Sequence, residues 1–171
     1  MIMITIRKTA PEDIAALGAL FDEARGTMAA LGIDQWQAGY PNASSAEEDR
    51  KQNRGYVLER EGEICGTVAL VSPEPTYRII ENGRWLTGDD GNYLALHRVA
   101  VAVNHRGTGV AEAILNHSEK VAKEQGKISL RIDTHRGNLP MRRMLERNGF
   151  THCGRIRLAN GDPREAYEKI I

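Results

Sequence analysis

The alternation of apolar and polar residues predicts strands and helices in mixed order at the start of the chain. Residues 2–7 alternate isoleucine with Met, Thr and Arg, which is typical of a strand with one buried face. Apolar residues at helical spacing predict a helix over residues 10–25, and Thr9 with Glu12 fits a capping box at its start. Residues 28–32 indicate a second short helix closed by a glycine.

Two β-rich stretches around a short glycine turn predict a hairpin next. Residues 56–60 and 64–71 are rich in β-branched and aromatic side chains and flank a Glu-Gly-Glu turn. Prolines and glycines then predict a long connection over residues 72–92, with at most a short strand around Tyr77–Ile80. Connections of this length often carry function.

The second half of the chain has a more regular pattern. Asn138 fits the N-cap of its last helix, with Pro140 in the first turn and Gly149 just beyond the end. No repeat or linker divides the chain, so we expect a single domain over residues 1–171, of the α/β class with mixed α+β character. The predicted elements are a strand over 93–103, a helix from 109 to 126, a strand over 128–133, a helix over 139–148 and strands over 150–158 and 166–171.

Composition narrows the classes of partner. Lys and Arg number 23 and Asp and Glu number 23, so no basic field indicates nucleic acid or an anionic membrane as a partner. The chain has no apolar run of membrane-spanning length and no signal-peptide pattern, so we expect a cytoplasmic protein. Cys65 and Cys153 lie far apart, which predicts free thiols and no cysteine-based zinc site, and we expect no metal. The sequence leaves the oligomeric state open, a homodimer included.

The segment from Val99 to Ala111 is the strongest candidate for a binding site. A buried strand leads into a glycine-bearing turn that opens a helix, so unpaired backbone N–H groups converge at the positive end of the helix dipole. Gly107 and Gly109 allow a ligand to approach the backbone, and Arg106 adds a permanent positive charge. The segment predicts a phosphate site, and the alternative is a tight turn whose glycines serve packing alone.

Other glycine-rich phosphate loops can be tested against the same residues. The GxxxxGK[ST] pattern is absent, which excludes a P-loop NTPase. A dinucleotide fingerprint GxGxxG fits Gly107 and Gly109 but meets Glu112 where the third glycine belongs. Because Asp133 follows the next strand in a ribose-binding position, a dinucleotide-dependent oxidoreductase stays open as an alternative.

The same segment resembles the signature of a known family. Arg106, Gly109 and Ala111 match the R/Q-x-x-G-x-G/A pattern of the GCN5-related N-acetyltransferase (GNAT) superfamily, and Asn138–Phe150 resembles its N-x-x-A/M…GF segment. The order of elements agrees over nearly the whole chain. The resemblance implies a GNAT-like fold, in which a mixed six- to seven-stranded sheet is flanked by about four helices and its parallel strands 4 and 5 splay apart.

The resemblance also implies acetyl-CoA as the acyl donor, bound between the splayed strands, with CoA as product. By analogy Asn138 contacts the cofactor from the last helix, and Arg142 or Arg143 meets its ribose phosphate; a solvated helix face is the alternative for these arginines. The remaining implied contacts are the pantetheine arm on the backbone of Val99 and Val101, and the pyrophosphate on the amides of Arg106, Gly107, Thr108, Gly109, Val110 and Ala111.

The reaction implied by the resemblance is direct transfer of the acyl group to an amine. A protonated amine cannot attack, so a base or a water chain must first remove a proton. His97 is the first candidate for this base, because it interrupts an apolar strand and shares the parity of Val99 and Val101. The alternative is a histidine held by structural hydrogen bonds. Arg98 is expected in an ion pair or a substrate carboxylate site.

One position departs from the family pattern. Many members have a tyrosine seven residues after the helix asparagine, which protonates the departing thiolate, and this chain has Leu145 there. Tyr93, His135 and Tyr167 are candidate substitutes, and helix entry alone also explains His135. The departure leaves open a second function, a catalytically silent domain that binds acyl-CoA as a sensor or interaction module.

The acceptor is expected to contact the variable segments 28–42 and 72–92. These segments contain large aromatic side chains, which are common in binding pockets and are also common in packing. We expect a small-molecule or peptide amine as the acceptor. The aromatic candidates are Trp36, Tyr40, Tyr77 and Trp85.

Overall fold

The chain forms two compact units, each with its own hydrophobic core. The computed structural model describes residues 3–88 and 91–171. The first unit comprises Met1–Leu70 and His97–His117, and the second comprises Val71–Leu96 and Ser118–Ile171. The boundaries fall inside two strands and one helix. The expected single domain over residues 1–171 stays a prediction.

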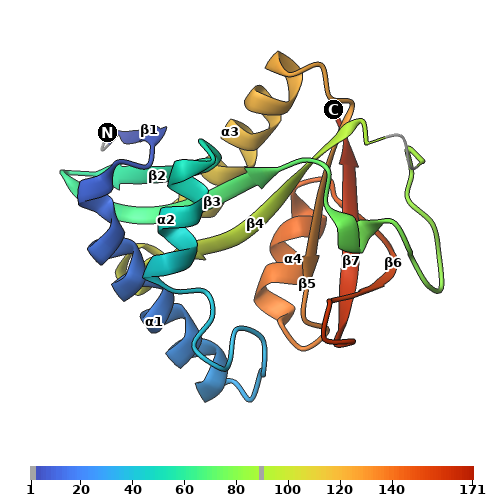
Figure 1. The fold of residues 1–171 in the computed structure, drawn as a ribbon, viewed down its shortest axis with the longest axis horizontal. Helices are drawn as coiled ribbons and strands as arrows, with labels where there is room; N and C mark the ends of the chain where they lie inside the picture. Colours follow the sequence, from blue (N-terminus) through green and yellow to red (C-terminus); the bar gives the residue numbers. More distant parts are fainter. Residues whose placement is uncertain (1–2, 89–90) are drawn as a thin grey trace. The chain divides into compact units, whose positions relative to one another are not determined.

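The described residues form one seven-stranded mixed sheet and four α-helices, as expected from the sequence (Figure 1). The strand order is β1-β2-β3-β4-β5-β7-β6. Among the described helices none is long and apolar enough to cross a membrane. The elements are β1 (Ile4–Lys8), α1 (Ile14–Ala30), α2 (Ala43–Lys51), β2 (Gly55–Arg60), β3 (Glu63–Val71), β4 (Tyr93–Val101), α3 (Val110–Glu124), β5 (Ser129–Thr134), α4 (Leu139–Arg147), β6 (Thr151–Arg157) and β7 (Pro163–Ile170).

The first unit places helices on both faces of its strands. Strands β1, β2 and β3 pair antiparallel, and side chains alternate between the two faces. Val57 of β2 is fully buried in a cluster with the apolar side of α1, while its neighbour Tyr56 contacts the ring of His117 in α3, with centroids 4.6 Å apart. Helix α3 therefore covers the opposite face of these strands from α1.

The structure corrects the sequence interpretation of residues 9–53. Residues 28–30 continue α1 and do not form a separate helix. The expected capping box of Thr9 and Glu12 is wrong, because the carboxylate of Asp13 accepts the Ala10 amide at 2.7 Å instead. Helix α2 was missed, because it is short and mostly polar; Asn42 caps it by accepting the Ser45 amide at 3.1 Å.

The second unit is built around β5, β7 and β6. The first residues of β4 pair parallel with β5 in a register that runs from Tyr93 opposite Ser129 to Ala95 opposite Arg131. Strand β7 then pairs antiparallel with both β5 and β6. Its apolar core joins these strands to the connection that follows β3, through the buried side chains of Tyr77, Trp85, Tyr93, Ala95, Cys153, Ile156 and Ala166.

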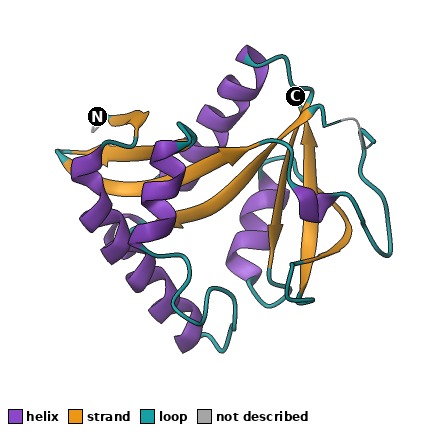
Figure 2. Ribbon diagram, in the orientation of Figure 1, coloured by secondary structure: helices purple, strands orange, loops and turns teal. Residues whose placement is uncertain are grey.

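Residues 72–88 of the long connection cover the outer edge of β6. Figure 2 shows it as loop interrupted by one short helical turn, Pro75–Tyr77. The strand allowed around Tyr77–Ile80 is reduced to one bridge, in which Glu81 and Arg155 exchange backbone hydrogen bonds of 2.7 and 2.9 Å. This pairing protects a sheet edge that would otherwise expose unpaired backbone groups.

A buried ion pair fixes the end of this connection to the sheet. Arg131 and Glu168 are 1% and 0% exposed, and Arg131 Nε lies 3.1 Å from Glu168 Oε1. The guanidinium of Arg131 stacks on the rings of Trp85 and Tyr93 at 4.3 and 4.1 Å. Burial raises the pKa of Glu168, but hydrogen bonds from Ser129 and Thr87 and the charge of Arg131 outweigh it, so the pKa falls below its usual value.

Candidate functional site

The turn between β4 and α3 presents free backbone amides at a helix start. The first helical bond in α3 runs from the Ala113 amide to Gly109 O at 3.0 Å, so the amides of Val110, Ala111 and Glu112 have no acceptor within the helix. Gly107 and Gly109 have left-handed φ angles of 71° and 91°, and a Cβ built at either would meet no atom within 4 Å. The backbone of this turn is therefore open to a ligand, and the helix dipole favours an anion there.

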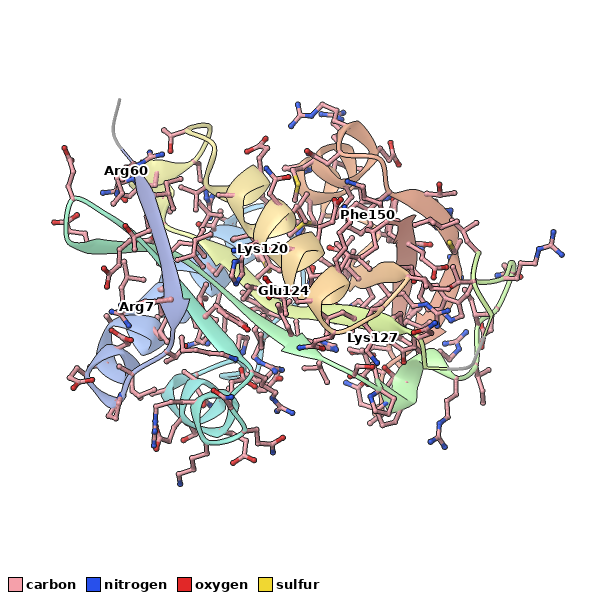
Figure 3. The ribbon with its side chains drawn as sticks, turned by 90° about the horizontal axis from the view of Figure 1, so that it is seen from above. Arg7, Arg60, Lys120, Glu124, Lys127 and Phe150 are labelled. Carbon is pink, nitrogen blue, oxygen red and sulfur yellow. The ribbon has the colours of Figure 1, made fainter. Side chains whose placement is uncertain are left out.

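Arg60 holds this turn in place, which the sequence did not indicate. Its Nη1 donates to Thr108 Oγ1 at 2.7 Å and its Nη2 donates to Thr108 O at 2.9 Å, and Figure 3 shows Arg60 beside the loop that leads into α3. The amide of Arg106 donates to Val103 O at 3.3 Å, while its side chain is exposed. The Arg106 amide, predicted to bind the pyrophosphate, is thus already bonded within the turn, and the two arginines add positive charge there.

At the end of β4, the backbone N–H and C=O groups of Val99 and Val101 lie on the edge of the strand that faces away from β3. The Ala102 amide donates to Cys65 O of β3 at 2.9 Å, and Ala100 O lies 3.3 Å from a Cβ built at Gly66 of β3. Because backbone polar groups alternate between the two edges of a strand, those of Val99 and Val101 point away from β3. The two valines predicted to pair with an extended ligand therefore have the required orientation.

Arg98 interrupts the regular geometry of β4. Its φ of 52° is in the left-handed region, which a residue with a side chain rarely adopts in a strand. The guanidinium donates to Asp49 from Nε at 2.6 Å and from Nη2 at 2.7 Å, and Nη1 donates to Tyr40 Oη at 2.8 Å. Burial lowers the pKa of Arg98, but the Asp49 and Tyr40 contacts raise it more. The expected ion pair of Arg98 is confirmed.

His97 lies directly before this interruption. Its ring is half-buried, and Nε2 is shielded from solvent. The shared parity with Val99 and Val101 assumed a regular strand, and the left-handed residue between them breaks that alternation. Its role as a base therefore depends on its position in β4 and no longer on parity.

Asp49 is a structural residue that the sequence analysis missed together with α2. The carboxylate is 4% exposed and also accepts from Arg54 Nε at 2.7 Å, so it binds two guanidinium groups. It joins α2 to β4 and to the start of β2. The signal that could have found it is the spacing of Ala46 and Asp49, the two buried residues on one side of α2.

Asn138 and Arg142 lie in the second unit, at the start of α4. Asn138 is 9% exposed and caps the helix, since its Oδ1 accepts the Met141 amide at 3.4 Å, as predicted. Arg142 is half-buried and donates from Nε to Tyr167 Oη at 2.8 Å and from Nη1 to Arg136 O at 3.0 Å. Arg143, by contrast, is exposed on the same helix.

The candidate proton donors all have structural partners. Tyr93 Oη accepts the Glu74 amide at 2.8 Å, and His135 Nδ1 accepts the Gly137 amide at 2.9 Å at the entry to α4. Tyr167 Oη is bound to Arg142, and burial raises its pKa despite that charge. Leu145 is fully buried, so a tyrosine at this position would overfill the core.

The aromatic residues of the variable segments divide into two groups. Tyr77 and Trp85 are 1% and 5% exposed and belong to the core of the second unit, where Trp85 Nε1 donates to Tyr77 O at 2.8 Å. Trp36 packs edge-on against Phe21 of α1, with ring centroids 6.0 Å apart. Tyr40 is half exposed and bound to Arg98. Among these four rings, Tyr40 is the one that solvent reaches most.

The sequence and the fold of the chain both resemble those of known proteins. A model of the acetyltransferase (GNAT) family matches residues 19–150. A GNAT-family acetyltransferase from Streptococcus agalactiae is 32% identical, with a TM-score of 0.87 over 98% of this chain and 95% of that chain. A search of curated proteins finds no match.

Two more distant structures share the fold. The ribosomal-protein-alanine N-acetyltransferase from Brucella melitensis is 22% identical, with a TM-score of 0.69 over 98% of this chain and 99% of that chain. The PaiA N-acetyltransferase from Thermoplasma acidophilum, solved in complex with coenzyme A, is 17% identical, with a TM-score of 0.67 over 99% of each chain.

Replacing Asp49 tests the anchor of β4. Asp49→Asn leaves two guanidinium groups without their carboxylate, and removal of one partner of a buried ion pair lowers the free energy of unfolding by about 3–5 kcal/mol. Urea denaturation measures the loss. Glu47→Gln on the same helix removes a partly exposed pair with Arg50 and serves as the control, with a much smaller expected change. Equal stability of the two variants would contradict the anchoring role.

Proposed function

Because the chain belongs to the GNAT acetyltransferase family, we propose that it transfers an acetyl group directly from acetyl-CoA to the amine of a small-molecule or peptide acceptor. It is an acyl-CoA-dependent N-acetyltransferase, and acetyl-CoA is the acyl donor of the family. The observation that carries the proposal is the open turn over Gly107–Ala111 at the start of α3. A cytoplasmic location is part of the proposal.

The residues of the first unit fit the groups of acetyl-CoA. The amides of Gly107–Ala111 and the charge of Arg106 suit a pyrophosphate, since anions bind where helix amides and the helix dipole converge. The outward backbone groups of Val99 and Val101 suit the amides of a pantetheine arm. In the second unit, Asn138 and Arg142 stay predictions from the family resemblance, with Arg142 expected to donate to a ribose phosphate. Acetyl-CoA supplies an activated acyl group, and the protein supplies position and charge.

The chain must also manage protons. An amine acceptor is a nucleophile only after it loses a proton, and we assign that proton to His97 in β4, directly or through water. The chain offers no hydroxyl at position 145, because Leu145 is buried in the core. The thiolate of CoA, an ordinary thiol with a reference pKa of about 8.5, leaves in this proposal without a proton from α4.

Direct transfer is favoured over an acetylated enzyme by the state of the two cysteines. Both are buried, and burial raises the pKa of Cys65 and raises that of Cys153 to about 11. A thiol with a raised pKa stays protonated near neutral pH and is a poor nucleophile. Acyl transfer through a cysteine is therefore disfavoured.

Amine-dependent release of CoA tests the proposed function. With acetyl-CoA and a panel of amines, we expect CoA and acetylated amine to form in equal amounts. Mass spectrometry of the protein after incubation with acetyl-CoA alone is expected to find no added acetyl group on a cysteine. Binding of acetyl-CoA without release of CoA for any amine would instead identify a sensor or interaction domain.

Gly109→Asp tests the placement of the pyrophosphate. The substitution adds a negative charge at the helix start and a side chain at a φ of 91°, so the Kd for acetyl-CoA is expected to rise by at least about tenfold. Gly126→Asp has a similar φ of 70° in open space at the far end of α3 and is the matched control. Unchanged affinity of a folded Gly109→Asp protein would reject this placement.

His97→Ala tests the proton acceptor. We expect kcat to fall by about 10²–10⁴-fold, the usual range for a lost general base, while the Kd for acetyl-CoA stays the same. The variant should recover activity as pH rises, because more of the amine is then already deprotonated. His152→Ala changes a half-exposed histidine of β6 and is the control. Wild-type kcat in His97→Ala would remove His97 from the mechanism.

A further inference from the structure

Buried charges in this protein are paired, with one exception among the described residues. The other buried charged side chains all form ion pairs within 4 Å: Asp13 with Arg7, Asp49 with Arg98, Arg131 with Glu168, and Glu165 with Arg155. Arg164 of β7 is 7% exposed and has no carboxylate within that distance in the described ranges 3–88 and 91–171. Buried charges are costly unless a partner neutralises them, so this exception needs an explanation.

The guanidinium of Arg164 has one acceptor among the described residues, and none of its nitrogens is both closed off from solvent and without a partner, so its other donors remain accessible. It carries five N–H donors, and its hydrogen bond within the described chain runs from Nη1 to Pro163 O at 2.9 Å. Arg131 of β5 is also buried. It instead binds Glu168, Thr87 and Gly88. Among the described residues, Arg131 thus has a carboxylate and two further acceptors, whereas Arg164 has one backbone carbonyl.

Register places Arg164 near the end of β5. It pairs with Ile156 of β6, which belongs to the core cluster with Tyr77 and Ala166. Residues two apart on a strand share a face, so Arg164 lies on the face of Ala166, and Ala166 pairs with Asp133 of β5. Asp133 and Arg164 are thus diagonal neighbours, at a typical separation of about 7–8 Å. Ligands of sheets with parallel strands bind at the carboxyl ends of those strands, and Asp133 is next to the end of β5.

We propose that Arg164 binds the carboxylate of the amine acceptor, so that the acceptor is an amino acid or the carboxyl end of a short peptide. This inference rests on the proposed function. The planar guanidinium matches a carboxylate with two parallel hydrogen bonds, and such charge-assisted pairs are strong when water is excluded. Binding of the acceptor would give Arg164 the carboxylate that residues 3–88 and 91–171 do not provide.

The surrounding charges favour a carboxylate over a phosphate. Asp133 lies on the same face, and its Oδ1 accepts from Tyr77 Oη at 2.7 Å, which leaves a negative charge beside Arg164. A single guanidinium with a carboxylate nearby suits a zwitterion, whose amine and carboxylate have opposite signs. Asp133 would repel a dianionic phosphate, and the single positive charge of Arg164 would not neutralise its two negative charges.

Matched acceptor pairs test this inference on the wild-type protein. The probes are the common L-amino acids against their α-amides, a short peptide with a free against an amidated carboxyl end, and phosphoethanolamine against ethanolamine. We expect kcat/KM for CoA release to be at least about tenfold higher for a carboxylate than for its amide, as the loss of a charge-assisted hydrogen bond predicts. The comparison of free amino acids with short peptides then shows which of the two supplies the carboxylate.

Variants of Arg164 connect this preference to the residue. Arg164→Gln is expected to raise KM for the carboxylate acceptor by at least about tenfold and to leave kcat/KM for the amide within about twofold. Arg164→Lys keeps the charge and should recover part of the loss. The matched control is Arg157→Gln, because Arg157 is an exposed arginine of the neighbouring strand β6 and pairs with Glu81.

The outcomes separate this inference from the proposed function. Turnover of amines with equal kcat/KM for carboxylates and amides, or a preference for phosphoethanolamine, would overturn the role of Arg164 and leave the acetyltransferase intact. Equal loss of both acceptor forms in a folded Arg164→Gln protein would overturn it as well. Absence of amine-dependent CoA release from every probe would instead contradict the proposed function itself.

Discussion

The ion pair between Arg98 and Asp49 is the contact on which the geometry of the central strand depends. Arg98 adopts a left-handed conformation in β4, which costs about 1–3 kcal/mol unless the surroundings hold it. Two hydrogen bonds to Asp49 of α2 and one to the hydroxyl of Tyr40, before α2, stabilise this conformation of Arg98. His97 lies on one side of this residue and Val99 on the other, so both proposed functions of β4 are positioned by a helix that carries no catalytic group.

Charge is distributed in the molecule according to what each group must do. Structural arginines are matched closely by carboxylates, as Arg131 is by Glu168 in the second core. Arg60 is used differently, since it binds the backbone and side chain of Thr108 and adds positive charge beside an open turn. Arg164 is buried without a carboxylate among the described residues. An enzyme whose substrates carry both phosphate and amine groups can use such unmatched charges for binding.

The sequence predicted the fold well where periodicity and capping signals agree. The helix over 139–148 and its N-cap Asn138 are confirmed within one residue by α4, because asparagine, proline and glycine mark its ends. Helix α2 was missed because it is short and polar, and its buried face consists of Ala46 and Asp49 alone. The turn at Gly107 and Gly109 could be found from glycine spacing, whereas the support from Arg60 could not. Arg60 is 48 residues from Thr108 in sequence, and only the folded hairpin brings them together.

Ligand-induced stabilisation tests the central claim most directly, because a ligand that binds the folded state raises its melting temperature by mass action. Thermal unfolding of the full chain should be followed with acetyl-CoA, CoA, NAD and ATP at equal concentrations. We expect acetyl-CoA and CoA to raise Tm, with little effect of NAD or ATP, because we propose that the turn before α3 binds the CoA pyrophosphate and that β4 binds the pantetheine arm. A rise with NAD and none with acetyl-CoA or CoA would contradict the account and favour a dinucleotide-binding protein.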